Sequence, residues 1–279
     1  MRGVGKLNWF ESVLYGIVSG ITEFLPISSL AHQKLMLKLF GQATHDPLQD
    51  LFVNLALLVA AFMGCKNLID QLRRGRHLRN NQRRGIRGNN DLLEIRFLKN
   101  ASFPMLIAYF ILLKCVPIGN SLIFVAVFSL LNAVIIFFPS RLMQGNKNER
   151  AVSIVDSFLV GLAGALSVFP GISRIASMLA VASIRGIEKR KAIDWALLLS
   201  IPALLLQVVV NLFALFTVEG RGNVYSSFWT YILSAIGAFA FGYVGISIMQ
   251  SSTGKDHSNY SFYAFGIMLF ALFLYLSVV

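Results

Sequence analysis

Long runs without charged residues dominate the hydropathy pattern of this chain. An α-helix needs about 20 residues to cross a bilayer, and several of these runs approach that length. They predict full crossings at about 51–65, 101–118, 121–139, 195–218, 227–250 and 258–279. The first is short and needs the preceding turn to complete it. The pattern therefore predicts an all-α polytopic membrane protein with about six transmembrane helices.

Two further apolar regions, about 12–40 and 157–184, differ from these runs. Each is interrupted midway by proline and serine, and each contains isolated charges. Helix-breaking residues are tolerated at membrane depth only where the backbone is buried in protein or lines a cavity. We therefore expect two re-entrant hairpins, each made of a helix, a break and a second helix.

Basic residues predict how these elements are oriented. Lys and Arg are concentrated at 66–99, 141–150, 185–191 and around Lys255, and such loops favour the cytoplasm. Alternating crossings satisfy every one of these placements if the 157–184 hairpin enters from the cytoplasm and the 12–40 hairpin enters from outside. The two hairpins are then inverted relative to each other, and both termini lie outside.

Composition excludes a soluble protein. The chain has 279 residues, of which 56% are hydrophobic and only 14% charged, with a mean hydropathy of +0.67. Soluble domains contain about 25% charged residues, so this chain has too little polar surface to cover a fold in water. The excess apolar surface must face lipid.

A net charge of +12 raises the question of a nucleic-acid partner. Ten of the 25 Lys and Arg residues lie between Lys66 and Lys99, where Phe97 is the only aromatic residue. Base recognition normally needs a folded module or interleaved aromatic residues. Glycines and paired asparagines instead indicate a partly flexible, basic cytoplasmic loop at 66–99 that orients the protein, so we expect no nucleic-acid partner.

The two hairpin regions resemble each other. Residues 19–29 align with 163–174, with Gly, Pro, Ile and Ser recurring in step and Gly171 as a single insertion. Copies that enter from opposite faces form an inverted repeat, which places a site near the midplane between broken helices. We expect one membrane domain over 1–279, with one repeat at about 8–140 and the other at about 151–279.

Candidate chemistry centres on two isolated charges. Glu23 is the only charge between Glu11 and Lys34, and Arg174 is the only charge between Asp156 and Arg185. Ionisable groups at membrane depth are costly, so they usually pair or serve a site. The two could form a structural ion pair that locks the hairpins. Alternatively, a guanidinium, a carboxylate and neighbouring hydroxyls form an intramembrane site for an anion.

The residues around both charges resemble a known family. Gly-Ile-Thr-Glu-Phe-Leu-Pro-Ile-Ser-Ser-Leu-Ala-His at 20–32 is similar to the first signature of the undecaprenyl-diphosphate phosphatase family, also called the bacitracin-resistance family. Pro-Gly-Ile-Ser-Arg at 170–174 resembles its second signature, and Leu-Leu-Ser-Ile-Pro-Ala at 198–203 is also similar. The resemblance spans nearly the whole chain.

Such a resemblance implies a multi-pass protein of the bacterial inner membrane with inverted re-entrant hairpins. The implied activity removes the terminal phosphate of undecaprenyl diphosphate and recycles the lipid carrier for peptidoglycan and other cell-wall polymers. It implies dependence on a divalent cation, Mg²⁺ or Ca²⁺. The implied partners are the membrane and a polyprenyl diphosphate lipid, and a homodimer stays open.

The resemblance also implies roles for individual residues. Glu23 would be the metal-binding or acid–base carboxylate, Ser29 the nucleophile or a phosphate ligand, and His32 the general acid or base. Arg174 would clamp phosphate oxygens. The implied substrate-binding residues are Ser19, Thr22, Ser28, Gly171 and Ser173. Attack by Ser29 with help from His32 and attack by a metal-bound water are both open.

The chain departs from the family pattern at several positions. Ser19 stands where the family usually has a second glutamate, one helical turn before Glu23. Leu30-Ala31 replaces Thr-Gly, and Ile175-Ala176 replaces Ser-Gly. Mg²⁺ and Ca²⁺ need several oxygen ligands, so the missing carboxylate weakens a metal site. Two alternatives follow, a polyprenyl-phosphate carrier or flippase and a catalytically impaired paralogue. Asp50 and Asp156, at span edges, are expected to be solvated or paired.

Overall fold

The computed structural model describes residues 7–42, 46–81, 86–115, 121–142, 147, 151–217, 224–252, 270, 272, 273 and 276. Within these ranges the regular structure is helical, apart from one isolated bridge between Lys147 and Ile187. The predicted all-α class is confirmed.

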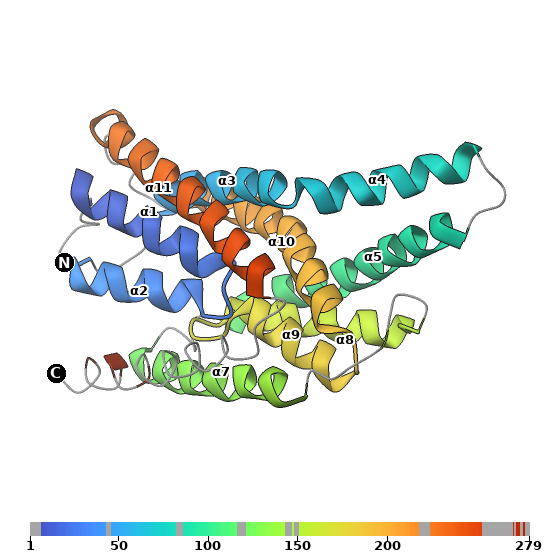
Figure 1. Ribbon diagram of the computed structural model, residues 1–279. Coiled ribbons are helices and arrows are strands. Elements are labelled where there is room, and N and C mark those ends of the chain that lie inside the picture. Colours follow the sequence, from blue (N-terminus) through green and yellow to red (C-terminus); the bar gives the residue numbers. More distant parts are fainter. Residues whose placement is uncertain are drawn as a thin grey trace.

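Both interrupted apolar regions fold as helix, break and helix. Their bounds are α1 (Trp9–Glu23) and α2 (Ser29–Leu39) for the first, and α8 (Ile154–Ala165), the 3-10 turn η2 (Leu166–Val168) and α9 (Arg174–Ile184) for the second. In Figure 1 the two hairpins open toward opposite ends of the molecule, and their breaks lie together near its centre. Their re-entry into a bilayer stays a prediction.

Matching caps explain where the first helix of each hairpin begins. At α1, the Asn8 side chain accepts from the Glu11 N–H at 2.9 Å, and the Asn8 N–H donates to the Glu11 carboxylate at 2.8 Å. At α8, Ser153 and Asp156 form the same reciprocal pair at 3.1 and 2.9 Å. Such capping boxes satisfy backbone donors that a helix start leaves open.

The long helices are α3 (Pro47–Gly64), α4 (Lys66–Asn81), α5 (Ile86–Leu112) with the 3-10 turn η1 (Leu113–Cys115), α7 (Leu122–Leu142), α10 (Lys189–Thr217) and α11 (Val224–Ser251). Four segments within them are long and apolar enough to cross a membrane: Pro47–Gly64, Leu93–Leu112, Lys189–Phe216 and Phe228–Ser251. These confirm a polytopic membrane protein. The predicted 121–139 crossing is helical but shorter in its apolar part (Leu122–Phe137), and most of 258–279 lies outside the described residues.

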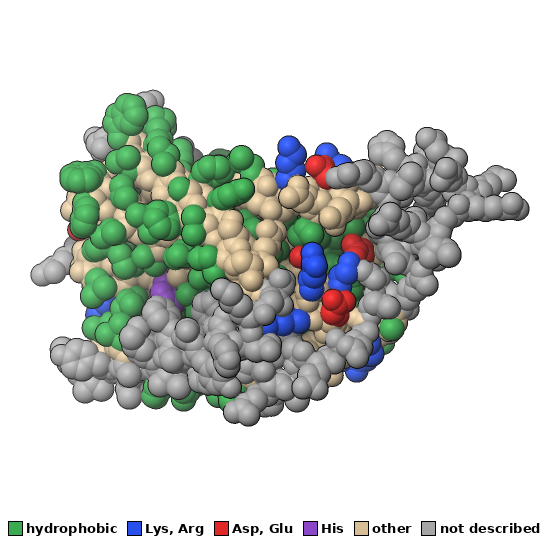
Figure 2. All heavy atoms as spheres, viewed as in Figure 1, with side chains coloured by type: hydrophobic (Ala, Val, Ile, Leu, Met, Phe, Trp, Pro, Cys, Tyr) green, Lys and Arg blue, Asp and Glu red, His purple; other side chains and the backbone are tan. Residues whose placement is uncertain are grey.

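The surface has the character expected beside lipid. Large hydrophobic side chains are widely exposed, among them Phe103 at 70%, Phe213 at 67% and Trp229 at 74%. On the face shown in Figure 2 they cover the part of the molecule that carries the α1–α2 hairpin, whereas charged side chains gather toward the end from which α4 and α5 project. An apolar belt of this kind marks a membrane-facing surface.

The prediction of a partly flexible loop at 66–99 was wrong. The chain continues from α3 into α4 at Lys66, and α5 begins at Ile86, so only residues 82–85 between them lie outside the description. Extending a helix that is already nucleated fixes one residue for each added hydrogen bond, which offsets the weak propensity of the glycines and asparagines. The cytoplasmic location of this segment stays a prediction.

Each hairpin packs its first helix against a long helix from the other half of the chain. The helix α1 lies on α11, and α8 lies on α5. Backbones approach closely at both places, since a Cβ added to Gly16 would be 2.0 Å from the Ser234 carbonyl oxygen and one added to Gly161 would be 2.1 Å from that of Ala101. In both hairpins the first helix therefore packs on a helix from the other half of the chain, which supports an internal repeat. That the two halves arose by duplication stays a prediction.

Candidate active site

Direct hydrogen bonds join the tips of the two hairpins. The Gly171 N–H donates to the Ser28 hydroxyl oxygen at 2.9 Å, and the Ser173 hydroxyl donates to the Leu25 carbonyl at 3.2 Å. The same two serines cap the second helices, because the side chain of Ser28 accepts from an N–H of α2 and that of Ser173 from an N–H of α9, both at 3.3 Å. Each serine therefore starts its own helix and also holds the opposite break.

An asparagine from α7 completes this junction. The Asn132 amide N–H donates to the Pro26 carbonyl at 3.2 Å, and its oxygen accepts from the Ser173 N–H at 2.8 Å. Broken helices leave backbone groups without helical partners, and in a buried setting these groups must be paired. Asn132 was missed in the sequence analysis. The sequence did contain a signal for it, because Asn132 is the only amide side chain in the predicted 121–139 span.

The inserted Gly171 is required by its surroundings. Its φ is +116°, a region that other residues rarely adopt, and an added Cβ would lie 2.5 Å from the Phe128 Cβ and 2.8 Å from the Ser129 nitrogen. Both neighbours belong to α7. The extra residue in the second hairpin therefore lets its break pass close to that helix.

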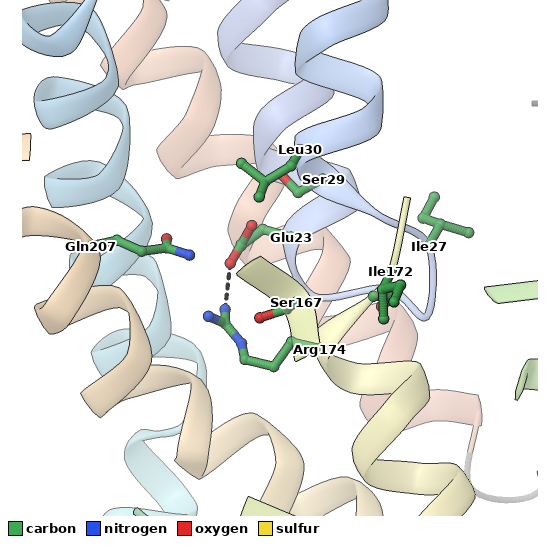
Figure 3. A pocket seen from close by; sticks show the side chains of 9 residues that line it. Glu23, Ile27, Ser29, Leu30, Ser167, Ile172, Arg174 and Gln207 are labelled. Carbon is green, nitrogen blue, oxygen red and sulfur yellow. Dashed lines mark hydrogen bonds and ion pairs between the residues drawn. The ribbon is translucent and has the colours of Figure 1, made fainter. Parts of the chain in front are cut away.

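The two isolated charges of the sequence meet at this junction. Glu23 ends α1 and Arg174 begins α9, and the Arg174 Nη2 donates to the Glu23 carboxylate (Figure 3). Their side chains are only 9% and 4% exposed. The Nε and Nη1 atoms of Arg174 are buried without a hydrogen-bond partner among the described residues. The guanidinium therefore keeps unused donors for an anion.

A cavity of about 20 Å³ adjoins the ion pair, with room for about one water. Besides the two charged residues, polar side chains from α2, η2, the N-cap of α9 and α10 border it. They are Ser29, Ser167, Ser173 and Gln207. In Figure 3 the Gln207 amide, from α10, points toward the ion pair.

Two of the predicted catalytic residues lie on the first turn of α2. Ser29 borders the small cavity, and its oxygen accepts from the Gln33 amide at 3.2 Å. His32 is buried, with Nδ1 at 2.6 Å from the Ser28 carbonyl oxygen. Since a carbonyl only accepts, Nδ1 carries the hydrogen and Nε2 is the basic atom of the ring.

Other predicted residues take structural positions. The Thr22 hydroxyl donates to the Val18 carbonyl of its own helix at 2.7 Å, and Ser19 is fully buried on α1. Neither borders a cavity described here. Ser28 and Gly171 contact each other instead of the cavity. The structure thus brings Glu23, Ser29, Ser173 and Arg174 together around the small cavity. The other predicted site residues do not border it: Ser19, Thr22, Ser28, His32 and Gly171.

A second cavity, of about 180 Å³, lies on the other side of Glu23. Its polar side chains come mainly from the long helices α3, α5 and α10. They are Glu23, Gln33, Asp50, Asn54, Tyr109, Gln207 and Asn211. Most of them were missed in the sequence analysis, although an amide inside an apolar span is a recognisable signal. Asp50 was expected to be solvated or paired. It accepts from the Tyr15 hydroxyl at 2.6 Å and also borders this cavity.

Asp156 confirms the expectation of pairing. It is buried at the start of α8, where Arg185 donates to it and the Lys147 ammonium lies 3.8 Å away. This second ion pair lies at one end of the molecule and borders neither cavity.

Within the described ranges, no three His, Cys, Asp or Glu side chains come close enough together to hold a metal ion alone. Magnesium does not require that, because it commonly uses one or two carboxylates together with water and substrate oxygens. The carboxylate of Glu23 beside a polar cavity fits such a cation.

Comparison with known proteins relates this chain to one family. The family described as bacitracin resistance protein BacA matches residues 12–273. An undecaprenyl-diphosphatase of Tropheryma whipplei (strain Twist) is 28% identical over 280 aligned residues, covering 95% of this chain and 97% of the relative. An undecaprenyl-diphosphatase of Prochlorococcus marinus (strain NATL2A) is 29% identical, with 93% and 94% covered. One of Methanococcus vannielii is 26% identical, with 94% and 99% covered. This chain belongs to the BacA family.

Proposed function

We propose that this protein hydrolyses a polyprenyl diphosphate, of the undecaprenyl type, to the monophosphate and inorganic phosphate. Family membership and the names of its relatives support a diphosphatase. The observation that carries the proposal is the buried Arg174, which pairs with Glu23 and keeps two donors unused. The exposed apolar belt supports a membrane-embedded enzyme that takes a lipid substrate. We place it in the bacterial inner membrane, where it would recycle the carrier for cell-wall polymers.

Arg174 would bind the terminal phosphate. A guanidinium matches two phosphate oxygens at once, and its planar set of donors is strongest where water is excluded. Arg174 is also the first residue of α9, so the positive end of that helix dipole lies at the same place and favours an anion. Exchange of the Glu23 carboxylate for a phosphate keeps the buried guanidinium paired throughout binding.

Glu23 pairs with Arg174 through Oε1. Its second oxygen, Oε2, would be available to hold the divalent cation that the family resemblance implies, both before and after phosphate binds. When bound, Mg²⁺ or Ca²⁺ would neutralise charge on the phosphate oxygens as a Lewis acid. Glu23 and Arg174 would then lie on two sides of one phosphate. Ser173 and Gln207, which border the same small cavity, would orient it.

Two routes of attack remain open. In one, the Ser29 oxygen bonds to phosphorus, its proton passes to a base, and the bond to the lipid monophosphate oxygen breaks. Water then releases inorganic phosphate from the serine. In the other, water attacks phosphorus directly. His32 would be the base in either route, through Nε2, because Nδ1 is held by the Ser28 carbonyl. His32 borders neither cavity, so this role requires it to approach the phosphate when substrate binds.

The test is phosphate release from a C55 polyprenyl diphosphate by the purified protein with Mg²⁺ or Ca²⁺. Arg174→Lys should lower kcat/KM by roughly 100-fold or more, because a lysine keeps the charge but loses the paired donors. Arg185→Lys is the matched control, since Arg185 caps the C-terminal end of α9 and also pairs with a carboxylate, but lies away from the site. No release by the unmodified protein, or equal effects of the two substitutions, would contradict the proposal.

Transport of a polyprenyl phosphate is a second candidate. The hairpins open toward opposite ends of the molecule and meet at one site, which is the arrangement that transporters with inverted repeats use (Figure 1). Proteoliposomes separate the two functions. Movement of the lipid headgroup between leaflets without phosphate release would favour transport, and phosphate release without movement would favour hydrolysis alone.

A further inference from the structure

We propose that the 180 Å³ cavity is a hydrated divalent-cation site in which Asp50 is the second carboxylate beside Glu23. The inference rests on the proposed function, because the cation would serve the phosphate that Arg174 binds. It assigns to a residue from α3 the role of second carboxylate, which a second glutamate on α1 usually has in the family.

Charge selects the kind of ligand. Glu23 and Asp50 both border the cavity, and no Lys, Arg or His borders it in the part of the chain that the structure describes. The remaining polar groups are amides and a phenol, which are neutral. A cavity with this lining attracts a cation and repels a second phosphate. The neighbouring small cavity is better suited to an anion, because the Arg174 guanidinium borders it.

The polar side chains from the two long helices lie at helical spacing. Asp50 and Asn54 lie one turn apart on α3, and Gln207 and Asn211 lie one turn apart on α10, so each pair shares a helix face. Both pairs border the cavity together with Glu23, which pairs with Arg174. Carboxylate and amide oxygens together with water are the donors that Mg²⁺ and Ca²⁺ prefer.

The space suits a cation that keeps its water. One water needs only about 10–15 Å³ of cavity volume, so 180 Å³ accommodates an ion with several waters. This explains why no cluster of three acidic or histidine side chains is needed among the described residues. Magnesium in particular gives up its water reluctantly and is usually held by one or two carboxylates.

A buried phenol holds Asp50 in place. The Tyr15 hydroxyl donates to one Asp50 oxygen at 2.6 Å, and Tyr15 is 1% exposed. Such an outer partner orients a ligating carboxylate and is typical of metal sites. By contrast, Ser19 is fully buried on α1 and does not border the cavity. The carboxylate available near Glu23 therefore comes from another helix.

The test measures Mn²⁺ binding to the purified full chain without substrate, through the electron paramagnetic resonance signal of free Mn²⁺. Asp50→Asn should weaken binding at least tenfold, because it removes one charge while keeping an acceptor for Tyr15. Asp46→Asn is the matched control and should leave the affinity unchanged. Asp46 begins the same helix, caps it and accepts from Tyr231, roles that an asparagine can fill. Equal affinities of Asp50→Asn and the unmodified protein, or no binding at millimolar Mn²⁺, would overturn the inference.

A substitution that should tighten Mn²⁺ binding is needed as well, because weaker binding by Asp50→Asn could also result from a destabilised protein. Asn54→Asp adds a carboxylate one turn from Asp50 and should tighten Mn²⁺ binding severalfold, whereas unchanged or weaker binding would count against the site. Phosphate release measured on the same samples separates the two proposals. Mn²⁺ binding that depends on Asp50 without any phosphate release supports the cation site and contradicts the hydrolase. Phosphate release together with an Mn²⁺ affinity that Asp50→Asn leaves unchanged supports the hydrolase and contradicts the cation site.

Discussion

The two hairpins share a backbone design and differ in the charges they carry. Each begins with a capping box and restarts after its break at a serine, Ser28 in the first and Ser173 in the second. In the sequence alignment of the two regions, Glu23 corresponds to Ser167, and Ser29 corresponds to Arg174. All four of these residues border the same small cavity.

This comparison shows how a repeated frame can produce an asymmetric site. The first hairpin contributes a carboxylate and one hydroxyl to the small cavity, the second contributes a guanidinium and two hydroxyls, and the two charges form an ion pair. A carboxylate repeated in both hairpins would have repelled itself in a buried site. Because the charges are opposite, the buried pair is neutral as a whole, and under the proposed function a phosphate would take the place of the carboxylate beside Arg174.

The strongest test of this asymmetry removes one charge at a time. Glu23→Gln or Arg174→Gln should lower the free energy of unfolding by about 3–5 kcal/mol, because each leaves an uncompensated buried charge. The double substitution should recover much of that loss, since neither charge remains. Thermal unfolding in detergent measures all three variants. A double variant whose loss equals the sum of the single losses would show that the two charges do not interact.

A second test uses the residue that only the second hairpin has. Gly171→Ala should cost about 3 kcal/mol, because a Cβ there meets α7 and the backbone has a positive φ. The control is Gly41→Ala. Its φ is +70°, but nothing lies within 4 Å of the added Cβ, so it should cost about 1 kcal/mol. Similar melting temperatures for the two variants would contradict the close approach to α7.

A third test removes the bridge between the breaks. Asn132→Ala leaves the Pro26 carbonyl and the Ser173 N–H without their buried partner, and should cost about 2 kcal/mol. Ser129→Ala is the control from the same helix. Its hydroxyl donates only to the Val125 carbonyl one turn earlier, so its loss should change stability by about 0.5 kcal/mol or less. Chemical unfolding of both variants gives the comparison, and an equal effect would remove Asn132 from its bridging role.

The smallest expected effect concerns the paired serines. Ser28→Ala and Ser173→Ala should each cost about 1 kcal/mol, because both cap a helix. Both also bond to the opposite hairpin, so their costs should agree within about 0.5 kcal/mol. Unfolding curves of the two variants measure this equivalence. A large effect of one alone would show that the hairpins are not held in matching ways.

Local patterns in the sequence determined much of this protein. Charge-free runs predicted the helices that can span a membrane, and the proline and serine interruptions located both breaks. In a chain so poor in charge, Glu23 and Arg174 stood out because burying an ionisable group is costly. The same reasoning failed at 66–99. Glycine and asparagine suggested a loop there, while helices entering from both sides continued into the segment.

Only the tertiary structure decided which polar side chains share a space. Asn132 and Pro26 are 106 residues apart, and Gly171 and Ser28 are 143 apart, yet both pairs are bonded at the junction. The second cavity likewise collects Asp50 and Gln207 from different long helices. Hydropathy gives the length of a helix but not its rotation about its own axis or its neighbours, because lipid-facing and protein-facing positions in these spans are equally apolar. Rotation and packing decide which amides and carboxylates reach Glu23.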